Sequence, residues 1–466
     1  MRIPFGIAGT KALARDRSVW RRFFLTAVAL FACYHAGAQE VLFNTFGAGE
    51  SFNSYGGPVV GDGVAWFLSG NNGAICAAAF TPVATIPFFR ADFAMIYGYT
   101  TDLDRTGLPN LDISLTADAN GFPGKPLETF HLTNVLEGTL APGMFSLNSV
   151  LHPVLQRGNQ YWFVVSTPDL LHTNFSWELG QPGAANRFAT WQFLSEVTSL
   201  TGWGPVGFPL GNGPAIEVLG GTGAPTPIPV IAENGIVSAA SFGVIGGLSP
   251  GSWVSVFGSN LSNTTRGWQM SDFGADGSLP TSLDGVSVLL NGKAAAISYV
   301  SSNQLNFQVP DPDIYQFPFA LQVVTPGGPS LPVSVTLAVT NPALFTISEG
   351  GVNYAAATFT DGTLVSPTRP ARPGDAVELY GTGFGPSNPP ILAGQIVRVP
   401  EPLADVSLYV TVGGLAAQVL YAGITEAGLD QINIVVPQVA PGNQGLSIVL
   451  TGLGVQGGIV LPVGVL

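Results

Sequence analysis

The chain has 466 residues, of which 46% are apolar and only 10% are charged, and its formal net charge is −13. This acidic balance excludes the clustered Lys and Arg that phosphate neutralisation requires, so nucleic acid is not an expected partner. Glycine (60) and proline (37) punctuate many short apolar runs without a collagen period, which is typical of all-β sandwiches.

The first 38 residues have the features of a signal peptide. Several arginines precede the apolar run Phe23–Tyr34, which is too short to span a bilayer. Ala36-Gly37-Ala38 then places small residues at the −3 and −1 positions of a cleavage site, so the mature chain is predicted to start near Gln39. A lipoprotein signal ending at Cys33 is the alternative, in which Phe31 stands where such motifs prefer a small residue.

Cleavage at this site changes the charge and the cysteine content. The segment holds six of the 16 basic residues and one of the 29 acidic residues, so the mature chain has a net charge of −18. Cys76 is the one cysteine left, so no intrachain disulfide forms and the cores must stabilise the fold. No second apolar segment approaches the length of a membrane span. We therefore expect a secreted or cell-surface protein without a membrane span after cleavage.

Residues 39–221 are predicted to form a head domain of antiparallel strands. Alternation in Leu111–Asp118 fits a half-buried strand, and Asn120-Gly121 is a strong hairpin signal directly after it. The motifs FNTFGAGESFNSYGG, LTADANGFPGKPL and LHPVLQRGNQYWFVVS resemble the choice-of-anchor domains of exported bacterial proteins. This resemblance implies a jelly-roll-like β-sandwich with no assigned biochemical role.

A Pro-rich linker, predicted for residues 222–232, leads into a second half that is duplicated. Three blocks return, Pro250–Leu261 as Pro373–Phe384, Asn291–Val300 as Gly413–Ala422, and Asn303–Pro310 as Asp430–Pro437. Two copies of one β-domain, residues 233–340 and 341–466, are the simplest interpretation. The duplication also predicts matching positions for Pro250 and Pro373, for Tyr299 and Tyr421, and for Phe307 and Ile434.

Further motifs run through both copies, among them GIVSAASF, SPGSWVSVFGSNL, RPGDAVELYGTGFGPSNPP and AGLDQINIVVP. By these motifs the second half is similar to the Solibacter-type uncharacterised C-terminal domain family. Each copy also resembles an immunoglobulin-like IPT/TIG domain, in which a Pro-Gly turn enters the first strand pair. The resemblance implies two tandem immunoglobulin-like β-sandwiches.

Two patterns known from enzymes are interpreted here as turns. Gly247–Gly251 fits G-x-S-x-G around Ser249, but Pro250 lacks the N–H that an oxyanion hole takes from the residue after the serine. Gly452–Gly457 fits G-x-G-x-x-G, but the residues that follow are strand-like, whereas a dinucleotide site needs a helix there. We therefore expect no catalytic centre.

The histidines and acidic turns show no diagnostic metal pattern. The spacings of 21 and 20 residues between His131, His152 and His172 are not diagnostic of a metal site, whose ligands must converge on one point. Asp102-Leu103-Asp104 and Asp118–Gly121 are oxygen-rich enough for calcium, but neither has the EF-hand pattern and Asx residues favour turns. The sequence predicts no metal and no cofactor, and both acidic motifs are interpreted as turns.

The head holds most of the tryptophans that remain after cleavage. Aromatic faces can stack on sugars, although a large aromatic side chain in a sandwich is more often part of the core. Trp162 lies in a strand-like run and is expected to be buried or packed at a strand edge. Trp191 and Trp203 lie near loop-rich sequence and are the two candidate ligand-binding residues.

Three functional hypotheses stay open at this stage. The first is a non-enzymatic exported protein, an adhesion, interaction or structural module with a head and a stalk of two repeats. The alternative is a carbohydrate-binding protein with the head as binder and the repeats as spacer. The third is an unrecognised hydrolase, which no sequence motif supports. The partner would be an extracellular polysaccharide or another surface protein.

Overall fold

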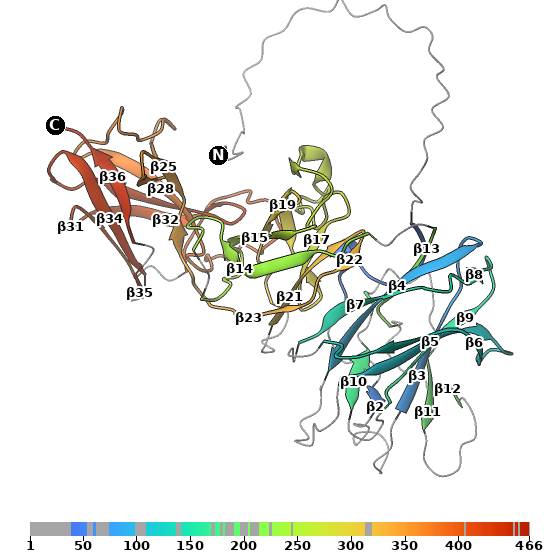
Figure 1. The fold of residues 1–466 in the computed structure, drawn as a ribbon. Helices are drawn as coiled ribbons and strands as arrows, with labels where there is room; N and C mark the ends of the chain where they lie inside the picture. The colour runs from blue at the N-terminus through green and yellow to red at the C-terminus, as the bar shows by residue number, and fades with distance from the viewer. Residues whose placement is uncertain are drawn as a thin grey trace, which may run out of the picture.

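The computed structural model describes residues 39–53, 59–61, 74–97, 109–136, 141–168, 173–177, 180–181, 191–195, 204–205, 214–222, 226–243, 246–312, 319–404, 407–450, 453–454 and 457–465. The predicted signal peptide, with Cys33, lies outside these ranges. Within them the regular elements are strands, apart from two 3₁₀ turns, η1 (Ala48–Glu50) and η3 (Met270–Asp272). The predicted all-β class is confirmed (Figure 1). None of the described helical turns has the length and hydropathy of a membrane span.

The head is built on one sheet of 13 strands among its described residues. These are β1 (Glu40–Asn44), β2 (Val59–Gly61), β3 (Ala74–Phe80), β4 (Ile86–Tyr97), β5 (Leu111–Asp118), β6 (Pro123–Leu132), β7 (Gly143–Asn148), β8 (Val154–Leu155), β9 (Tyr161–Ser166), β10 (Asn174–Trp177), β11 (Trp191–Ser195), β12 (Gly204–Pro205) and β13 (Ile216–Gly220). The main order is β1-β13-β4-β10-β2-β3-β9-β5-β6.

This sheet turns back on itself at β10, which pairs with the long β4 on one side and the short β2 on the other. The core of the head draws buried aromatic rings from both halves of the sheet. Phe88 and Phe93 come from β4 and Phe163 comes from β9, and the rings of Phe93 and Phe163 meet edge to face at 5.2 Å between centroids. The head is therefore a sandwich made by one folded sheet.

The first repeat has two antiparallel sheets around a core of aliphatic side chains and Phe307. The first sheet contains β14 (Val230–Ser238), β15 (Trp253–Ser259), β20 (Gln304–Gln308), β19 (Ala296–Val300) and β16 (Arg266–Gly267), and the second contains β18 (Lys293–Ala294), β17 (Ser287–Leu290), β21 (Phe319–Thr325), β22 (Gly328–Pro329) and β23 (Val333–Val335). Strand β14 begins inside the segment predicted as linker, because Val230 and Ile231 pair with the end of β15.

The second repeat has the same two-sheet plan. The first sheet contains β24 (Ala343–Leu344), β27 (Ala357–Phe359), β28 (Ala376–Thr382), β33 (Leu429–Val435), β32 (Gln418–Glu426) and β29 (Glu401–Pro402). The second contains β25 (Thr346–Glu349), β26 (Val352–Ala355), β36 (Ile459–Val463), β34 (Gly442–Leu450), β35 (Leu453–Gly454), β30 (Leu408–Val412) and β31 (Leu415–Ala416).

The strand registers of the two repeats agree residue by residue. The equivalent pairs are Val254↔Phe307 and Val377↔Ile434, Ile297↔Phe307 and Val419↔Ile434, and Tyr299↔Asn306 and Tyr421↔Asn433. In both copies a β-bulge precedes the tyrosine. The predicted matches of Tyr299 with Tyr421 and of Phe307 with Ile434 are confirmed.

Pro250 and Pro373 open the same turn in the two copies. The glycines that follow them, Gly251 and Gly374, have φ of 79° and 90°, which a residue with a β-carbon adopts at a cost. Each glycine N–H donates at 2.8 Å to a backbone oxygen at the end of the neighbouring strand. The predicted match of these prolines is confirmed, and each turn leads into an equivalent strand, β15 in the first repeat and β28 in the second.

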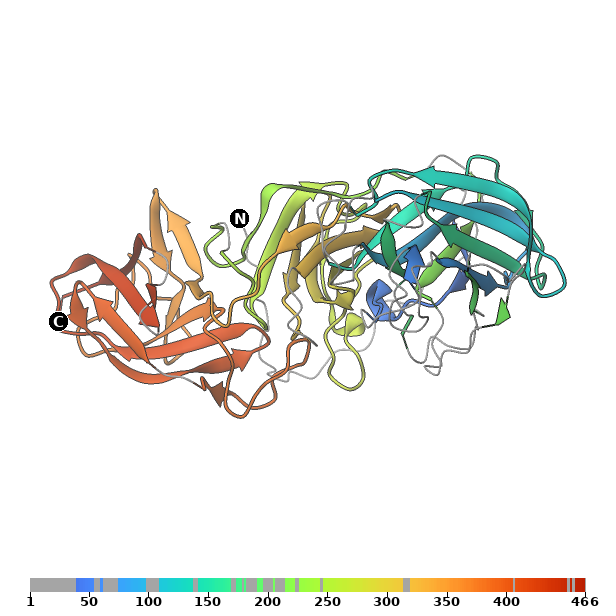
Figure 2. The same ribbon diagram turned by 90° about the horizontal axis from the view of Figure 1, so that it is seen from below.

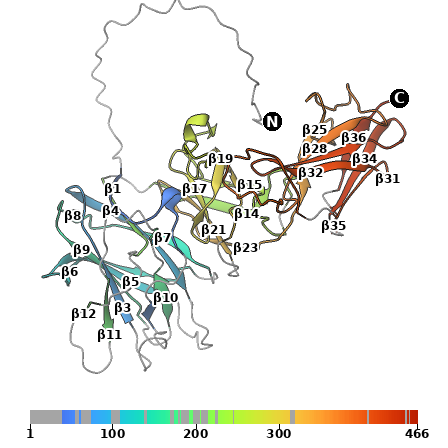
Figure 3. The same ribbon diagram turned by 180° about the vertical axis from the view of Figure 1, so that it is seen from behind.

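The three modules follow one another in a row, with the head at one end and the second repeat at the other (Figures 1, 2 and 3). At the first joint, Phe46, Phe52 and Met144 of the head pack against Leu289 and Val324 of the first repeat. These apolar side chains are all nearly inaccessible to solvent.

The second joint is formed by hydrogen bonds between the ends of the two repeats. The N–H of Trp253 donates to Thr382 Oγ1 at 2.9 Å, and its indole Nε1 donates to the backbone oxygen of Ala427 at 2.7 Å. Two long loops also meet there, because Ser278 of the first repeat forms a β-bridge with Gln395 of the second. The two repeats are thus connected by more than the chain between them.

Candidate functional site

Of the two tryptophans predicted to bind a ligand, the structure describes only the backbone of Trp191. Trp191 is the first residue of β11, where its backbone pairs with Ala78 of β3. The side chain of Trp191, and Trp203 as a whole, are outside the described residues. Their role as ligand-binding residues stays a prediction.

Two other tryptophans of the head belong to its core. Trp162 is 1% exposed, and its Nε1 donates to Asp118 Oδ1 at 2.8 Å. Trp177 is fully buried, and its Nε1 donates to the backbone oxygen of Ala215. The expected burial of Trp162 is confirmed.

The carboxylate of Asp118 holds a turn together. Its Oδ2 accepts the N–H of Gly121 at 3.0 Å, and its Oδ1 accepts hydrogen bonds from Gln160 and Trp162. These donors, the N–H of Gly121 first, lower the pKa of Asp118. The turn interpretation is confirmed for this motif, whereas Asp102 and Asp104 lie outside the described residues.

The histidines serve separate local contacts. His131 Nδ1 lies 2.7 Å from Asp112 Oδ1 on the surface of the hairpin β5–β6. His152 stacks on Phe89, with Nδ1 3.1 Å from the backbone oxygen of Phe88. His172 lies outside the described residues. Among the side chains that the structure places, no three His, Cys, Asp or Glu residues converge as metal ligands would.

The two enzyme-like patterns are structural. Ser249 is buried, and its Oγ donates to the backbone oxygen of Val339 at 3.0 Å, so this hydroxyl links the turn to the end of the first repeat. Within the second pattern, Leu453 and Gly454 form β35, which pairs antiparallel with β34. That segment is a hairpin, as its sequence predicts.

A partly exposed aromatic surface lies on the first repeat. Trp268 packs edge-on against Trp253, with ring centroids 5.5 Å apart, and its other neighbour, Phe273, is at 5.1 Å. Trp253 is 8% exposed, whereas Trp268 and Phe273 are half-buried, and Met270 beside them is 82% exposed. We call Trp268, Met270 and Phe273 the Trp268 surface.

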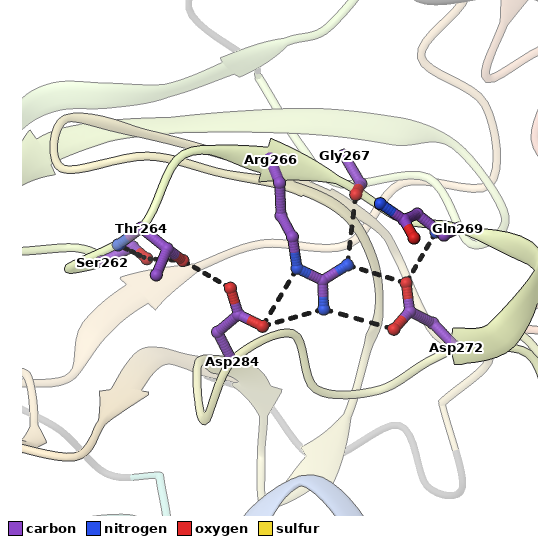
Figure 4. A network of polar contacts seen from close by, with 7 residues as sticks. All are labelled: Ser262, Thr264, Arg266, Gly267, Gln269, Asp272 and Asp284. Atoms are coloured by element: carbon purple, nitrogen blue, oxygen red, sulfur yellow. Dashed lines mark hydrogen bonds and ion pairs between the residues drawn. The ribbon is translucent and has the colours of Figure 1, made fainter. Parts of the chain in front are cut away.

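Arg266 fixes the loop that carries the Trp268 surface (Figure 4). Its guanidinium is 2.8 Å from Asp272 Oδ2 and 2.9 Å from Asp284 Oδ1, and Thr264 also donates to Asp284. The hydrogen bonds from Arg266 lower the pKa of both aspartates. A bidentate network of this kind holds the loop between β16 and η3 in one conformation, and with it the aromatic rings.

Nothing in the sequence pattern indicated that the Trp268 surface, and not the head, is a candidate ligand-binding site. Trp268, Met270 and Phe273 lie between the repeated blocks Pro250–Leu261 and Asn291–Val300, in a stretch whose sequence the second copy does not repeat. A departure of one copy from the repeat pattern is the signal that could have identified it.

A cluster of ionisable groups lies buried at the first joint. Arg90 and Asp92 are 3% and 1% exposed and form an ion pair at 2.9 Å, while Arg90 Nη1 also donates to the backbone oxygen of Pro326 in the first repeat. Burial, together with the negative charges of its neighbours, raises the pKa of Glu217 and of Glu50. We call these four residues the joint cluster.

A small pocket lies at the second joint, lined by Gln308, Gly383, Leu392 and Gly428 among others. Asp430 is one of its lining residues, and its Oδ2 accepts the N–H of Phe384 at 3.0 Å. Burial raises the pKa of Asp430 to about 7 in spite of this hydrogen bond. The carboxyl group thus caps a turn of the second repeat from inside the joint.

A scan against protein-family models and a search of curated proteins find no match. Among solved structures, the chain is similar to a surface glycan-binding protein from Prevotella bryantii (14% identity, 50% of this chain, 41% of that chain, TM-score 0.17). It is also similar to a surface glycan-binding protein of a xyloglucan utilization locus in Bacteroides uniformis (14%, 51%, 50%, 0.17).

A third similar structure is a membrane anchored protein from Corynebacterium diphtheriae (9% identity, 87% of this chain, 95% of that chain, TM-score 0.12). The chain spans half or less of the length of the two glycan-binding proteins. These likenesses at low TM-score assign no ligand to the chain.

Proposed function

We propose that the protein is an exported, non-enzymatic interaction protein in which two immunoglobulin-like repeats form a stiff stalk for a β-sandwich head. The observation that carries this proposal is the pair of inter-module joints. Domains joined by a flexible linker move relative to one another unless their interface is large and apolar. Here the first joint is a buried apolar cluster, and the second is held by several hydrogen bonds that involve backbone and side-chain atoms of both repeats.

Export is part of the same proposal. The arginines, the short apolar run and Ala36-Gly37-Ala38 support a cleaved signal peptide and a secreted or cell-surface location. The repeated motifs, which resemble those of the Solibacter-type family and of IPT/TIG domains, support tandem repeats, and we propose that these act as structural or adhesive modules. The partner is an extracellular polysaccharide or another surface protein.

Two measurements on the mature protein test this function. N-terminal sequencing of the exported protein should return Gln39 as the first residue, and a lipid-modified Cys33 would contradict it. Small-angle scattering data should be fitted by a single elongated conformation, because a stiff row of three modules has one maximum dimension. An ensemble fit should give a narrow distribution of that dimension. A broad distribution would show freely moving modules and overturn the stalk.

A carbohydrate-binding function is the second candidate, and the Trp268 surface favours it. Two neighbouring aromatic rings on a loop fixed by Arg266 offer apolar faces beside polar groups, which is the combination that sugar rings need. On this proposal the binder would include the first repeat, in addition to Trp191 and Trp203 of the head.

A glycan array with the mature protein tests this candidate. Trp268→Ala should abolish binding to any polysaccharide that the wild type retains, whereas Phe242→Ala, which also removes a partly exposed ring from the first repeat, should leave it unchanged. If Trp191→Ala abolishes binding and Trp268→Ala does not, the binding site lies in the head and not on the first repeat. Turnover of a bound glycan would overturn the non-enzymatic assignment.

A further inference from the structure

The second sheet of each repeat has an outer face, and the two faces are equivalent by strand register. In the second repeat the pairs Tyr409↔Val449, Thr411↔Ser447 and Thr411↔Ala416 lie where the first repeat has Ser287↔Val324, Leu289↔Gln322 and Leu289↔Ala294. We call the set Tyr409, Thr411, Ala416, Ser447 and Val449 the Tyr409 face.

In the first repeat the head covers most of this face. Leu289 and Val324 are 1% and 4% exposed and pack against Phe52 and Met144 of the head. The amide of Gln322 is hydrogen-bonded to both backbone polar atoms of Met144. The outer face of this sheet is therefore a docking surface within the chain itself.

In the second repeat the same face is open to solvent. Tyr409 is 55% exposed, and Ala416 and Ser447 are exposed as well. The described strands β30, β31 and β34 contain no Asp, Glu, Lys or Arg. An uncharged face with an exposed tyrosine thus lies on the repeat farthest from the head (Figures 1 and 3).

We propose that the Tyr409 face is a self-association surface, which pairs with the same face of a second copy of this chain. The charge of the protein favours this occupant. Two mature copies, with a net charge of −18 each after the predicted cleavage, repel one another, and this repulsion is weakest where the facing surfaces carry no charge. A contact between identical faces related by a two-fold axis is self-complementary and closes after two copies.

The shape and composition of the face also favour a second copy over a polysaccharide. Sheets pack face to face through small and β-branched side chains, which Thr411, Ala416 and Val449 supply. Tyrosine is enriched in the buried centre of protein interfaces. Sugar platforms are formed by several rings, whereas Tyr409 is the one aromatic residue among the described residues of β30, β31 and β34.

Sedimentation equilibrium of the mature full-length protein, over a range of micromolar concentrations, tests the proposal. The wild type should show a monomer–dimer equilibrium, and Tyr409→Glu should weaken dimerisation about tenfold or more by placing two negative charges in the contact. Phe242→Glu is the matched control, because Phe242 is an aromatic residue of similar exposure on the first repeat. It should leave the dissociation constant unchanged.

Mixing gives a second readout that does not depend on the stability of one variant. Tyr409→Glu and Tyr409→Lys should each be monomeric alone and should form a mixed dimer when combined, because an isologous contact brings the two substituted faces together. A wild type that stays monomeric over the whole range would overturn the proposal. So would a dimer that Tyr409→Glu leaves intact, or a mixture that does not associate.

Discussion

Gln322 of the first repeat and Met144 of the head are joined by a pair of hydrogen bonds that imitates a β-ladder. The side-chain Oε1 of Gln322 accepts the Met144 N–H at 2.7 Å, and its Nε2 donates to the Met144 backbone oxygen at 2.9 Å. Gln322 is 2% exposed, so these bonds are shielded from water. One side chain thus ties the edge of the head to the sheet of the next module.

Replacement of this side chain should loosen the first joint. Gln322→Leu removes both partners of Met144 and leaves a buried N–H and a buried backbone oxygen unsatisfied, which costs about 1–3 kcal/mol for each group. We expect a lower urea midpoint and faster proteolysis between head and first repeat. Gln418→Leu, at an exposed position of β32, is the control and should change neither. An unaltered midpoint for Gln322→Leu would show that the apolar cluster alone holds the joint.

The joint cluster predicts that stability falls as the pH rises. Burial, Glu50 and Asp92 raise the pKa of Glu217 from 4.5 to about 8, with Arg90 as the opposing positive charge. A carboxyl with a raised folded-state pKa stabilises the fold while it is protonated. That contribution is lost from about pH 4.5 upward, as the unfolded chain ionises first, until the folded value is passed.

Glu217→Gln tests this sign, because the amide stays neutral at every pH. Its urea midpoint should fall less between about pH 5 and pH 9 than that of the wild type, and it should exceed the wild-type midpoint at the upper end. Glu349→Gln, on an exposed strand end, should follow the wild type throughout. A Glu217→Gln profile parallel to the wild type would mean that Glu217 is ionised in the joint.

Asp430 gives a matching prediction for the second joint, and the repeat itself supplies the test variant. Its pKa is raised from 3.8 to about 7, so its protonated form stabilises the fold below pH 4 and this contribution is lost as the pH rises to about 7.

The first copy has Asn303 at this position. Asp430→Asn should therefore raise the free energy of unfolding at about pH 8 by a few kcal/mol at most, because each tenfold change in an ionisation constant corresponds to about 1.4 kcal/mol. Urea unfolding at that pH measures the change, and a lower value for the variant would show that the ionised carboxylate is needed for the turn at Phe384.

The sequence was sufficient for the repeats because they are local patterns. Alternation in NQLNFQVP and DQINIVVP identifies the buried positions, and the duplication places Phe307 and Ile434 at one ladder position before the fold is known. The joints were not predicted. Arg90, Glu217 and Gln322 lie far apart in the chain, and each is an ordinary polar residue in its own segment. Their meeting depends on how whole domains dock, which no local period encodes.

Among the aromatic residues, too, the sequence predicts the environment of some and not of others. Trp162 lies in a continuous apolar run, and such a run predicts burial, which the structure confirms. The Trp268 surface depends on ring contacts with Trp253 and on the guanidinium of Arg266, and these contacts arise only when β16 and the loop after it fold over the sheet. Sequence spacing does not report them.

The matched turns at Pro250 and Pro373 lead to a paired prediction. Gly251 and Gly374 both have positive φ, and a β-carbon added to either would meet no atom within 4 Å. Substitution of either glycine should therefore lower the free energy of unfolding only through the unfavourable backbone conformation, by about 1–2 kcal/mol for an L-residue in the left-handed region. Gly251→Ala and Gly374→Ala should lower the free energy of unfolding by similar amounts in that range. Gly246→Ala has the same open surroundings without positive φ and should be neutral or slightly stabilising. Unequal costs at the two glycines would show that the turns, although equal in hydrogen bonding, differ in strain.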